Sequence, residues 1–177
     1  MPHAVACSRE SLGYNGQAPK TEADEIESGH APSVASAPVG ATVRLPSFDE
    51  IVEHWSVIAP HLRKATVRTG CYEPIDLLQL ALAGQVGIWT CEVGGNIVAA
   101  IATTVKQYPR KRILEILFCG GSQMREWIDV AVQKIDAHAH ECGCSHVSGI
   151  GRISWGRVWG GKVTDYVIVR GLGELHV

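Results

Sequence analysis

The sequence predicts a single α/β domain with a mixed, mostly antiparallel sheet flanked by helices, preceded by an extended N-terminal arm. Two strand-like segments, Val86 to Val93 and Ile97 to Val105, are joined by Gly94-Gly95, a two-residue hairpin turn signal. A short segment rich in β-branched residues, Arg112 to Phe118, follows as a third strand. A long amphipathic helix from about Ser122 to Glu141 then supplies an apolar stripe that can cover a sheet.

Length and composition limit the classes of protein to which this chain can belong. The 177 residues suit one domain of ordinary size, and the net charge of −2 gives no case for sequence-specific nucleic-acid binding. The chain has no apolar run of about 18 residues and no secretory signal pattern, so we expect no membrane partner. Its six cysteines are then most simply reduced thiols, and we expect folding in a cytoplasm.

Residues 1–45 form the predicted arm, and residues 46–177 form the predicted domain. The arm is rich in Ala, Ser, Pro, Gly and Glu, and it cannot bury enough apolar surface to fold alone. It is therefore either a disordered tail or an arm that orders on other protein chains of a multi-copy assembly. Its candidate anchors are scattered singly: Val5, Leu12, Tyr14, Val34, Val39, Val43 and Leu45.

The helices before the sheet carry local signals. Ser47 and Glu50 form a capping box that begins the first helix. Pro60 is expected to break or kink this helix, with a second segment continuing to about Arg68. Pro74 begins a further helix. After the long helix we expect a strand from Ser145 to Gly151, a short helix from Ser154 to Val158 and a final strand from Lys162 to Arg170.

A glycine pair stands between the third strand and the long helix. A strand that turns into a helix N-terminus presents backbone N–H groups, which is a natural site for an anion. The candidate cofactor-binding residues are therefore Gly120, Gly121, Ser122 and Gln123.

From about residue 46 to residue 170, this order of elements resembles the GNAT superfamily of N-acetyltransferases. The pattern is most similar to GNAT-like proteins of tailed bacteriophages. The residues that carry this resemblance are the basic turn Gln107 to Arg112, the strand end Cys119 to Gly121, Trp127, Gly143-Cys144, and Arg152, Trp155 and Val158. The resemblance implies a GNAT fold, with acetyl-CoA as the cofactor of an active member.

The sequence departs from the GNAT pattern at the phosphate turn. Active members carry Arg/Gln-x-x-Gly-x-Gly/Ala before the long helix. Here the glycines of the turn are adjacent, and Leu117 stands where Arg or Gln is expected. The turn looks unlike a working acetyl-CoA cradle, so no cofactor is expected under the main interpretation.

The resemblance implies two candidate catalytic residues. Glu115 on the third strand would be the general base, and Tyr166 on the last strand would protonate the leaving thiolate. Each has a structural alternative. Glu115 could instead be an exposed strand residue or a partner of Arg112 or Lys111, and Tyr166 could be a half-buried strand tyrosine.

Two other groups of side chains were considered as sites. The basic turn offers Tyr108, Arg110, Lys111 and Arg112 as partner contacts, and the alternative is a solvated turn. The densest set of metal-ligand residues lacks the spacing of zinc modules, so no metal is expected. This set comprises His138, His140, Cys142, Cys144 and His146.

Two functions follow. The first is a non-catalytic phage structural or assembly protein, made in the host cytoplasm and incorporated into a virion, which docks on other protein chains. The alternative is an acetyl-CoA-dependent N-acetyltransferase that uses Glu115 and Tyr166. Because a fold alone does not establish an activity, the glycine turn is the feature that separates the two.

Overall fold

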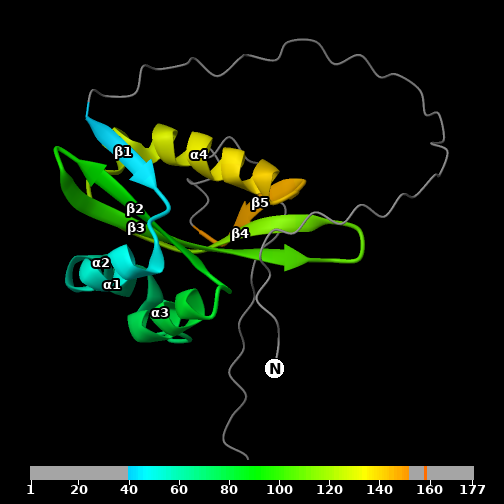
Figure 1. The fold of residues 1–177 in the computed structure, drawn as a ribbon, viewed down its shortest axis with the longest axis horizontal. Coiled ribbons are helices and arrows are strands. Elements are labelled where there is room, and N and C mark those ends of the chain that lie inside the picture. The colour runs from blue at the N-terminus through cyan, green and yellow to red at the C-terminus, as the bar shows by residue number, and fades with distance from the viewer. Residues whose placement is uncertain (1–39, 152–157, 159–177) are drawn as a thin grey trace, which may run out of the picture.

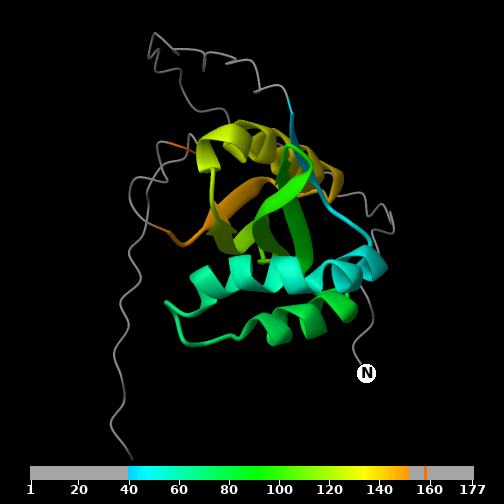
Figure 2. The same cartoon turned by 90° about the vertical axis from the view of Figure 1, so that its left-hand side faces the viewer.

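The computed structural model of this chain describes residues 40–151 and residue 158. One five-stranded sheet lies between two layers of helices (Figures 1 and 2). Helix α4 (Met124–Glu141) covers one face of the sheet. Helices α1 (Phe48–Glu53), α2 (Trp55–Thr66) and α3 (Pro74–Leu82) cover the other. The predicted α/β architecture is therefore confirmed.

The strands lie side by side in their order along the chain. They are β1 (Ala41–Arg44), β2 (Gly87–Val93), β3 (Asn96–Gln107), β4 (Arg112–Gly121) and β5 (His146–Gly149). The first four are antiparallel to their neighbours, and β5 is parallel to β4. The predicted hairpin is confirmed, with Gly94 and Gly95 at positive φ in its turn. Strand β3 is buried from Val98 to Thr103, as predicted for the central strand.

Strand β1 was not predicted. The sequence analysis placed Ala41–Arg44 in the arm, but these residues pair with β2, so the sheet begins before the expected start at Pro46. Val43, an expected anchor for neighbouring chains, is only 2% exposed and packs in its own domain. Arg44 fixes the strand because its guanidinium binds Glu92 on β2 at 3.1 Å and Glu50 on α1 at 2.6 Å.

The capping box at the start of α1 is confirmed. The Ser47 amide donates to Glu50 Oε2 at 2.8 Å, and the Glu50 amide donates to Ser47 Oγ at 3.4 Å. Of the predicted break or kink at Pro60, the break is wrong, because α2 runs through Pro60 and the helix is interrupted at His54 instead. Pro60 and Ser56 are both exposed, so water can satisfy the Ser56 carbonyl that loses its helical donor.

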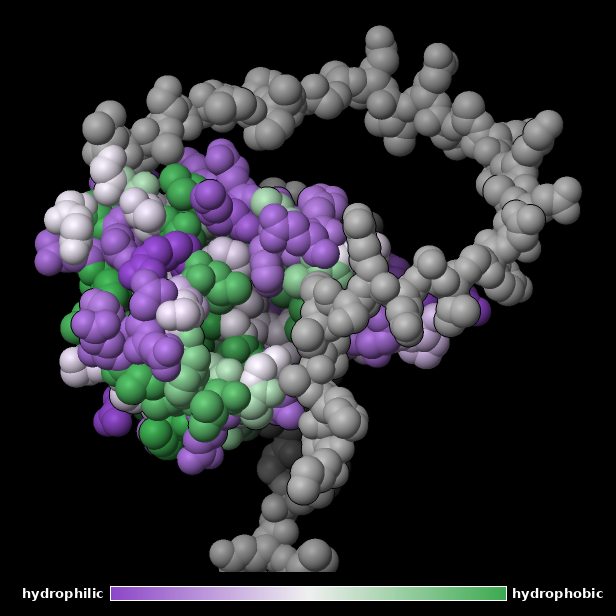
Figure 3. Space-filling view, in the orientation of Figure 1, coloured by the Kyte–Doolittle hydropathy of each residue, from purple (hydrophilic) through white to green (hydrophobic). Residues whose placement is uncertain are grey.

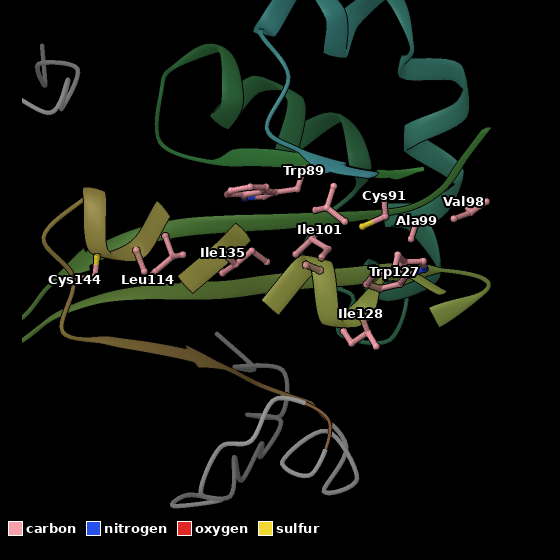
Figure 4. Close-up of a cluster of buried hydrophobic side chains, with 13 residues drawn as sticks. Trp89, Cys91, Val98, Ala99, Ile101, Leu114, Trp127, Ile128, Ile135 and Cys144 are labelled. Atoms are coloured by element: carbon pink, nitrogen blue, oxygen red, sulfur yellow. The ribbon is translucent and has the colours of Figure 1, made fainter. Parts of the chain in front are cut away.

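The sheet separates two apolar cores. Figure 4 shows the core beneath α4, where Trp127 and Ile135 of the helix meet Trp89, Ile101 and Leu114 of the strands. The Trp89 indole N–H donates to Thr103 Oγ1 at 3.0 Å, which satisfies a buried donor within this layer. In the other core, the fully buried residues Ile58, Leu62 and Leu77 pack on the opposite face of β2, β3 and β4.

The helical layer also presents apolar surface to solvent, seen as green areas in Figure 3. The exposed aliphatic residues of α1, α2 and α3 are Val52, Val57, Ile75 and Leu82. Within residues 40–151, no helix is long and apolar enough to cross a membrane. The expected final strand, and all of the expected short helix except Val158, lie outside the described residues.

Candidate functional site

Strand β4 has two halves with different neighbours. From Ile113 to Ile116 it pairs with β3 on one side and with β5 on the other. Leu117 is then an extra residue opposite β3, a β-bulge, because Ala102 pairs with Phe118 and Thr103 pairs with Ile116. Beyond the bulge β4 continues to Gly121, and in the described part of the chain no strand pairs with its outer edge. This open edge leads to the N-terminus of α4.

The two glycines extend β4 rather than turning the chain. The predicted end of the strand at Phe118 is wrong, because Gly120 pairs with Ala100 and Gly121 pairs with Ala99. A Cβ on Gly120 would overlap the carbonyl oxygen of His61 in α2, and one on Gly121 would overlap Ala99. The glycine pair therefore allows close approach of β4 to α2 and β3.

His61 lies at this contact. Its Nε2 lies 3.2 Å from the carbonyl oxygen of Ile97, which can only accept, so Nε2 carries the proton. Burial lowers the pKa of His61, and the charge of Lys64 acts in the same direction. The imidazole is therefore a neutral group that ties α2 to the start of β3.

The turn after Gly121 uses part of the expected anion site for internal hydrogen bonds. The Ser122 amide donates to Val98 O at 2.9 Å, and its hydroxyl points to the same oxygen at 3.4 Å. Helix α4 therefore begins at Met124 rather than near Ser122. Its N-cap is Gln123, which has left-handed backbone angles (φ 52°, ψ 36°) and no capping hydrogen bond from its side chain. Of the four expected residues, only Gln123 belongs to the helix N-terminus itself.

The first amides of α4 remain for an anion. Those of Met124 and Arg125 come before the first intrahelical bonds and lie at the positive end of the helix dipole. Arg125 is exposed and adds a positive side chain in the same turn. The Trp127 indole donates to Ser122 O at 2.8 Å and holds the turn against the helix. An anion at this end would meet fewer amides than the GNAT pattern provides.

Glu115 is held by an ion pair. The carboxylate contacts the ammonium of Lys106, which lies diagonally opposite on β3. The Glu115 side chain is 17% exposed and that of Lys106 is 46% exposed, so solvent reaches the pair from the lysine side. The hydrogen bond with Glu115 raises the pKa of Lys106, despite the opposing effect of burial. The partner is therefore Lys106, not Arg112 or Lys111 as expected for a structural role, and an amine at Glu115 would compete with it.

Tyr72 is a further candidate residue, which the sequence did not indicate. It lies between α2 and α3, and its ring packs edge-on against Phe118, with centroids 5.5 Å apart, beside the Leu117 bulge. It is 37% exposed and close enough to Lys106 to raise that lysine's pKa slightly. The available signal was an aromatic residue in a short loop between Gly70 and Pro74, a place where a site residue often lies.

The thiols near β4 are poor nucleophiles. Burial raises the pKa of Cys119 to about 12, and burial also raises the pKa of its neighbour Cys91. Both thiols are protonated at neutral pH, and a thiol attacks only as thiolate.

The other predicted site residues are dispersed. His138 and Cys142 share a helical face as expected, with Nε2 and Sγ 3.5 Å apart, and His138 also packs on Trp89. Among the described residues, no group of three or more His, Cys, Asp or Glu could hold a metal ion. Tyr166, Arg152 and Trp155 lie outside the described residues. The basic turn is at the far tip of the β3–β4 hairpin, away from the glycine pair.

No family model matches this sequence, and no curated protein matches it. Solved structures do match. One is a possible acetyltransferase from Clostridium difficile 630, with a TM-score of 0.56, 12% identity, and coverage of 75% of this chain and 97% of that chain. A probable acetyltransferase has a TM-score of 0.55 and 11% identity over 77% of this chain and 98% of that chain.

An aminoglycoside N-acetyltransferase in complex with CoA matches with a TM-score of 0.54 and 11% identity. The match covers 75% of this chain and 95% of that one. These names describe enzymes and give no support to the expected phage or virion role. At such low identity the likeness concerns architecture rather than activity. The chain therefore has the fold of the GNAT N-acetyltransferases, as its element order suggested.

Proposed function

We propose that this protein is an acetyl-CoA-dependent N-acetyltransferase with a reduced phosphate-binding turn. The observation that carries the proposal is the outer edge of β4 beyond Ile116, which no strand of the described residues covers and which leads directly to the N-terminus of α4. An unpaired strand edge can hydrogen-bond an extended ligand that carries amides, and a helix N-terminus favours phosphate. Acetyl-CoA combines both kinds of group. Similar structures that hold CoA or a CoA conjugate support the same choice.

Particular residues would share the work of binding. The backbone of Leu117 to Gly121 would pair with the amide-bearing arm of the coenzyme, and the first amides of α4 and Arg125 would face its phosphates. When bound, acetyl-CoA would supply a thioester that is open to attack by an amine. The Ser122 amide is already bonded to Val98 O, so we expect weaker binding than a complete phosphate turn gives.

Glu115 would accept the proton from the attacking amine. It lies on the doubly paired half of β4, two residues before the open edge begins at Leu117. Lys106 would act as a positioning residue, because it holds the carboxylate in place across the hairpin. Tyr72 would line the acceptor side with its exposed ring edge. Tyr166 remains the acid that the resemblance implies for the leaving thiolate.

A second candidate is a non-catalytic GNAT-fold protein that docks on other protein chains, as in a phage assembly. The observation that favours it is the packing of the glycine pair, which commits Gly120 and Gly121 to contacts with α2 and β3. In this case the turn contributes to stability, and the partner contacts lie on the arm and the basic turn.

Calorimetric titration of the full chain with acetyl-CoA separates the two. We expect a dissociation constant on the order of 10–100 µM, about −5.5 to −6.8 kcal/mol. Replacing Gly121 would be a poor test, because any side chain there overlaps Ala99 and threatens the fold. Arg125→Glu is better, since Arg125 is exposed, and it should weaken binding by about tenfold.

Lys134→Glu is the matched control, because it makes the same charge change on an exposed residue farther along α4. It should leave the affinity unchanged.

Thiol release should then be measured with aminoglycosides and with peptides that have free N-termini. Glu115→Gln should lower the rate by about 10²–10⁴ with little change in coenzyme affinity. Absence of any heat of binding at millimolar acetyl-CoA would leave the docking module as the function.

A further inference from the structure

The tip of the β3–β4 hairpin is a preorganised basic surface. Strand β2 accompanies β3 only as far as Thr103, so the hairpin extends beyond the sheet (Figure 1). The Tyr108 amide donates to Lys111 O at 2.8 Å, and Gln107 Nε2 donates to Tyr108 O at 2.7 Å, which fixes the turn around Pro109. A groove of about 430 Å³ lies here, lined by Tyr108, Pro109, Arg110, Lys111 and Ile113.

Among the described residues, Arg110 and Lys111 of this tip have no acidic partner. Elsewhere in the hairpin Lys106 is paired with Glu115. By contrast, no carboxylate of residues 40–151 lies within ion-pair distance of Arg110 or Lys111. The Lys111 ammonium instead lies 3.4 Å from Nε2 of His146. The result is an apolar groove bordered by unneutralised positive charge.

A segment of the same sequence has the complementary pattern. Residues 22–27, Glu-Ala-Asp-Glu-Ile-Glu, carry four carboxylates within six residues, and Ile26 stands between two of them. An aliphatic side chain flanked by acids matches a groove of Tyr108, Pro109 and Ile113 flanked by Arg110 and Lys111. We propose that residues 22–27 of a second copy of the chain dock on this hairpin tip.

The length of the chain favours a second copy over the same copy. Ala41 pairs with Val93 of β2, and Val93 pairs with Asn96 at the end of β3 that is opposite the hairpin tip. Strand β3 spans about 36 Å from Asn96 to Gln107, and the two strand spacings between β1 and β3 add about 10 Å sideways. The twelve residues 28–39 reach at most about 40 Å when fully extended and average about 20 Å when flexible. Docking within one copy would need an almost fully stretched chain.

If two copies exchange their acidic segments, the basic tip of each copy is occupied. Each copy offers one acidic segment and one basic tip, so a two-fold dimer closes with two identical contacts. The second contact forms within an assembly that the first has already made, which raises its effective concentration. The contact is independent of acetyl transfer, because it lies at the hairpin tip rather than at the open edge of β4.

Zero-length carbodiimide cross-linking of the full chain tests the proposal. Equal amounts of ¹⁴N- and ¹⁵N-labelled protein are mixed, and peptides that join Lys111 to residues 22–27 are identified by mass spectrometry. We expect about half of these cross-links to join differently labelled copies, the share that random pairing of two copies gives, with a yield that rises with protein concentration. Any substitution of Lys111, such as Arg110→Glu/Lys111→Arg, removes the amine that reacts in carbodiimide coupling. The role of the positive charge is therefore tested separately, by sedimentation.

In sedimentation, Arg110→Glu/Lys111→Glu should abolish the dimer, and adding Glu25→Lys/Glu27→Lys should restore it. Arg63→Glu/Lys64→Glu is the matched control, because these exposed α2 residues undergo the same charge change. It should leave the dimer intact. The proposal is overturned if the cross-links join only residues of one copy, if none joins these segments, or if the charge exchange fails to restore association.

Discussion

Gly120→Ala provides a direct test of the role assigned to the glycine pair. The added Cβ would overlap the carbonyl oxygen of His61 and lie 3.1 Å from the carbonyl carbon, with the Ala65 amide nitrogen at 3.6 Å. These are backbone atoms, so no side-chain rotation relieves the overlap, and α2 must move from the sheet by about 1 Å.

The loss in the free energy of unfolding depends on the side chains that α2 buries. Its Ile58 and Leu62 are fully buried, and each contributes about 1.5–3 kcal/mol through burial. A gap of about 1 Å forfeits a quarter to a half of their dispersion contacts. The smaller chain entropy of unfolded alanine offsets part of this loss, so we expect the free energy of unfolding to fall by about 1–2 kcal/mol.

Urea unfolding of the full chain, followed by tryptophan fluorescence, measures the change. The midpoint should fall by about 0.5–1 M. Gly149→Ala is the control, since its Cβ would meet only Ile116, at 3.3 Å, and it should cost less than about 1 kcal/mol. A Gly120→Ala protein within about 0.5 kcal/mol of the original would show that β4 does not need this close approach to α2.

Three further outcomes follow from single contacts. The Ser47 amide and the Arg44 guanidinium lower the pKa of Glu50 from 4.5 to about 2. The ionised carboxylate therefore stabilises the fold above its ordinary pKa, and this stabilisation is lost as the pH falls from about 4.5 toward 2. The stability difference between the original protein and Glu50→Gln should accordingly vanish near pH 2 in pH-dependent urea unfolding. Trp89→Phe removes the buried donor to Thr103 and should cost about 1–2 kcal/mol by thermal unfolding; no loss would mean that the bond is not made. Cys119 should react with iodoacetamide far more slowly than the exposed Cys71 in native peptide mapping, because its raised pKa leaves almost no thiolate; equal rates would contradict its burial.

Local signals made part of this fold predictable. The Ser47–Glu50 capping box and the Gly94-Gly95 hairpin depend on residues that are close in sequence, and both are present. The long helix is predicted by its apolar stripe, and the stripe residues Trp127 and Ile135 pack against the sheet as expected. In each of these cases the pattern and the contact involve the same few residues.

Contacts between distant segments could not be predicted in this way. Strand β1 has one buried residue, Val43, and it exists because β2 offers an edge with which it pairs. The sequence of the glycine pair predicts a turn, but in the structure both glycines belong to β4. They are needed there because α2 and Ala99 approach the strand too closely for a side chain. Glu115 was identified as a candidate from the resemblance, whereas its partner Lys106 became clear only when the hairpin register was known.

The order of the strands also bears on how the domain assembles. Strands β1 to β4 each pair with a sequence neighbour, although the three helices separate β1 from β2. The β2–β3–β4 meander needs only short loops, so it can form early at small entropic cost. The parallel β5 must wait for the crossover through α4. We therefore expect β5, and with it the end of the β4–β5 pairing at Ile116 that sets where the open edge of β4 begins, to be among the last parts of the sheet to form.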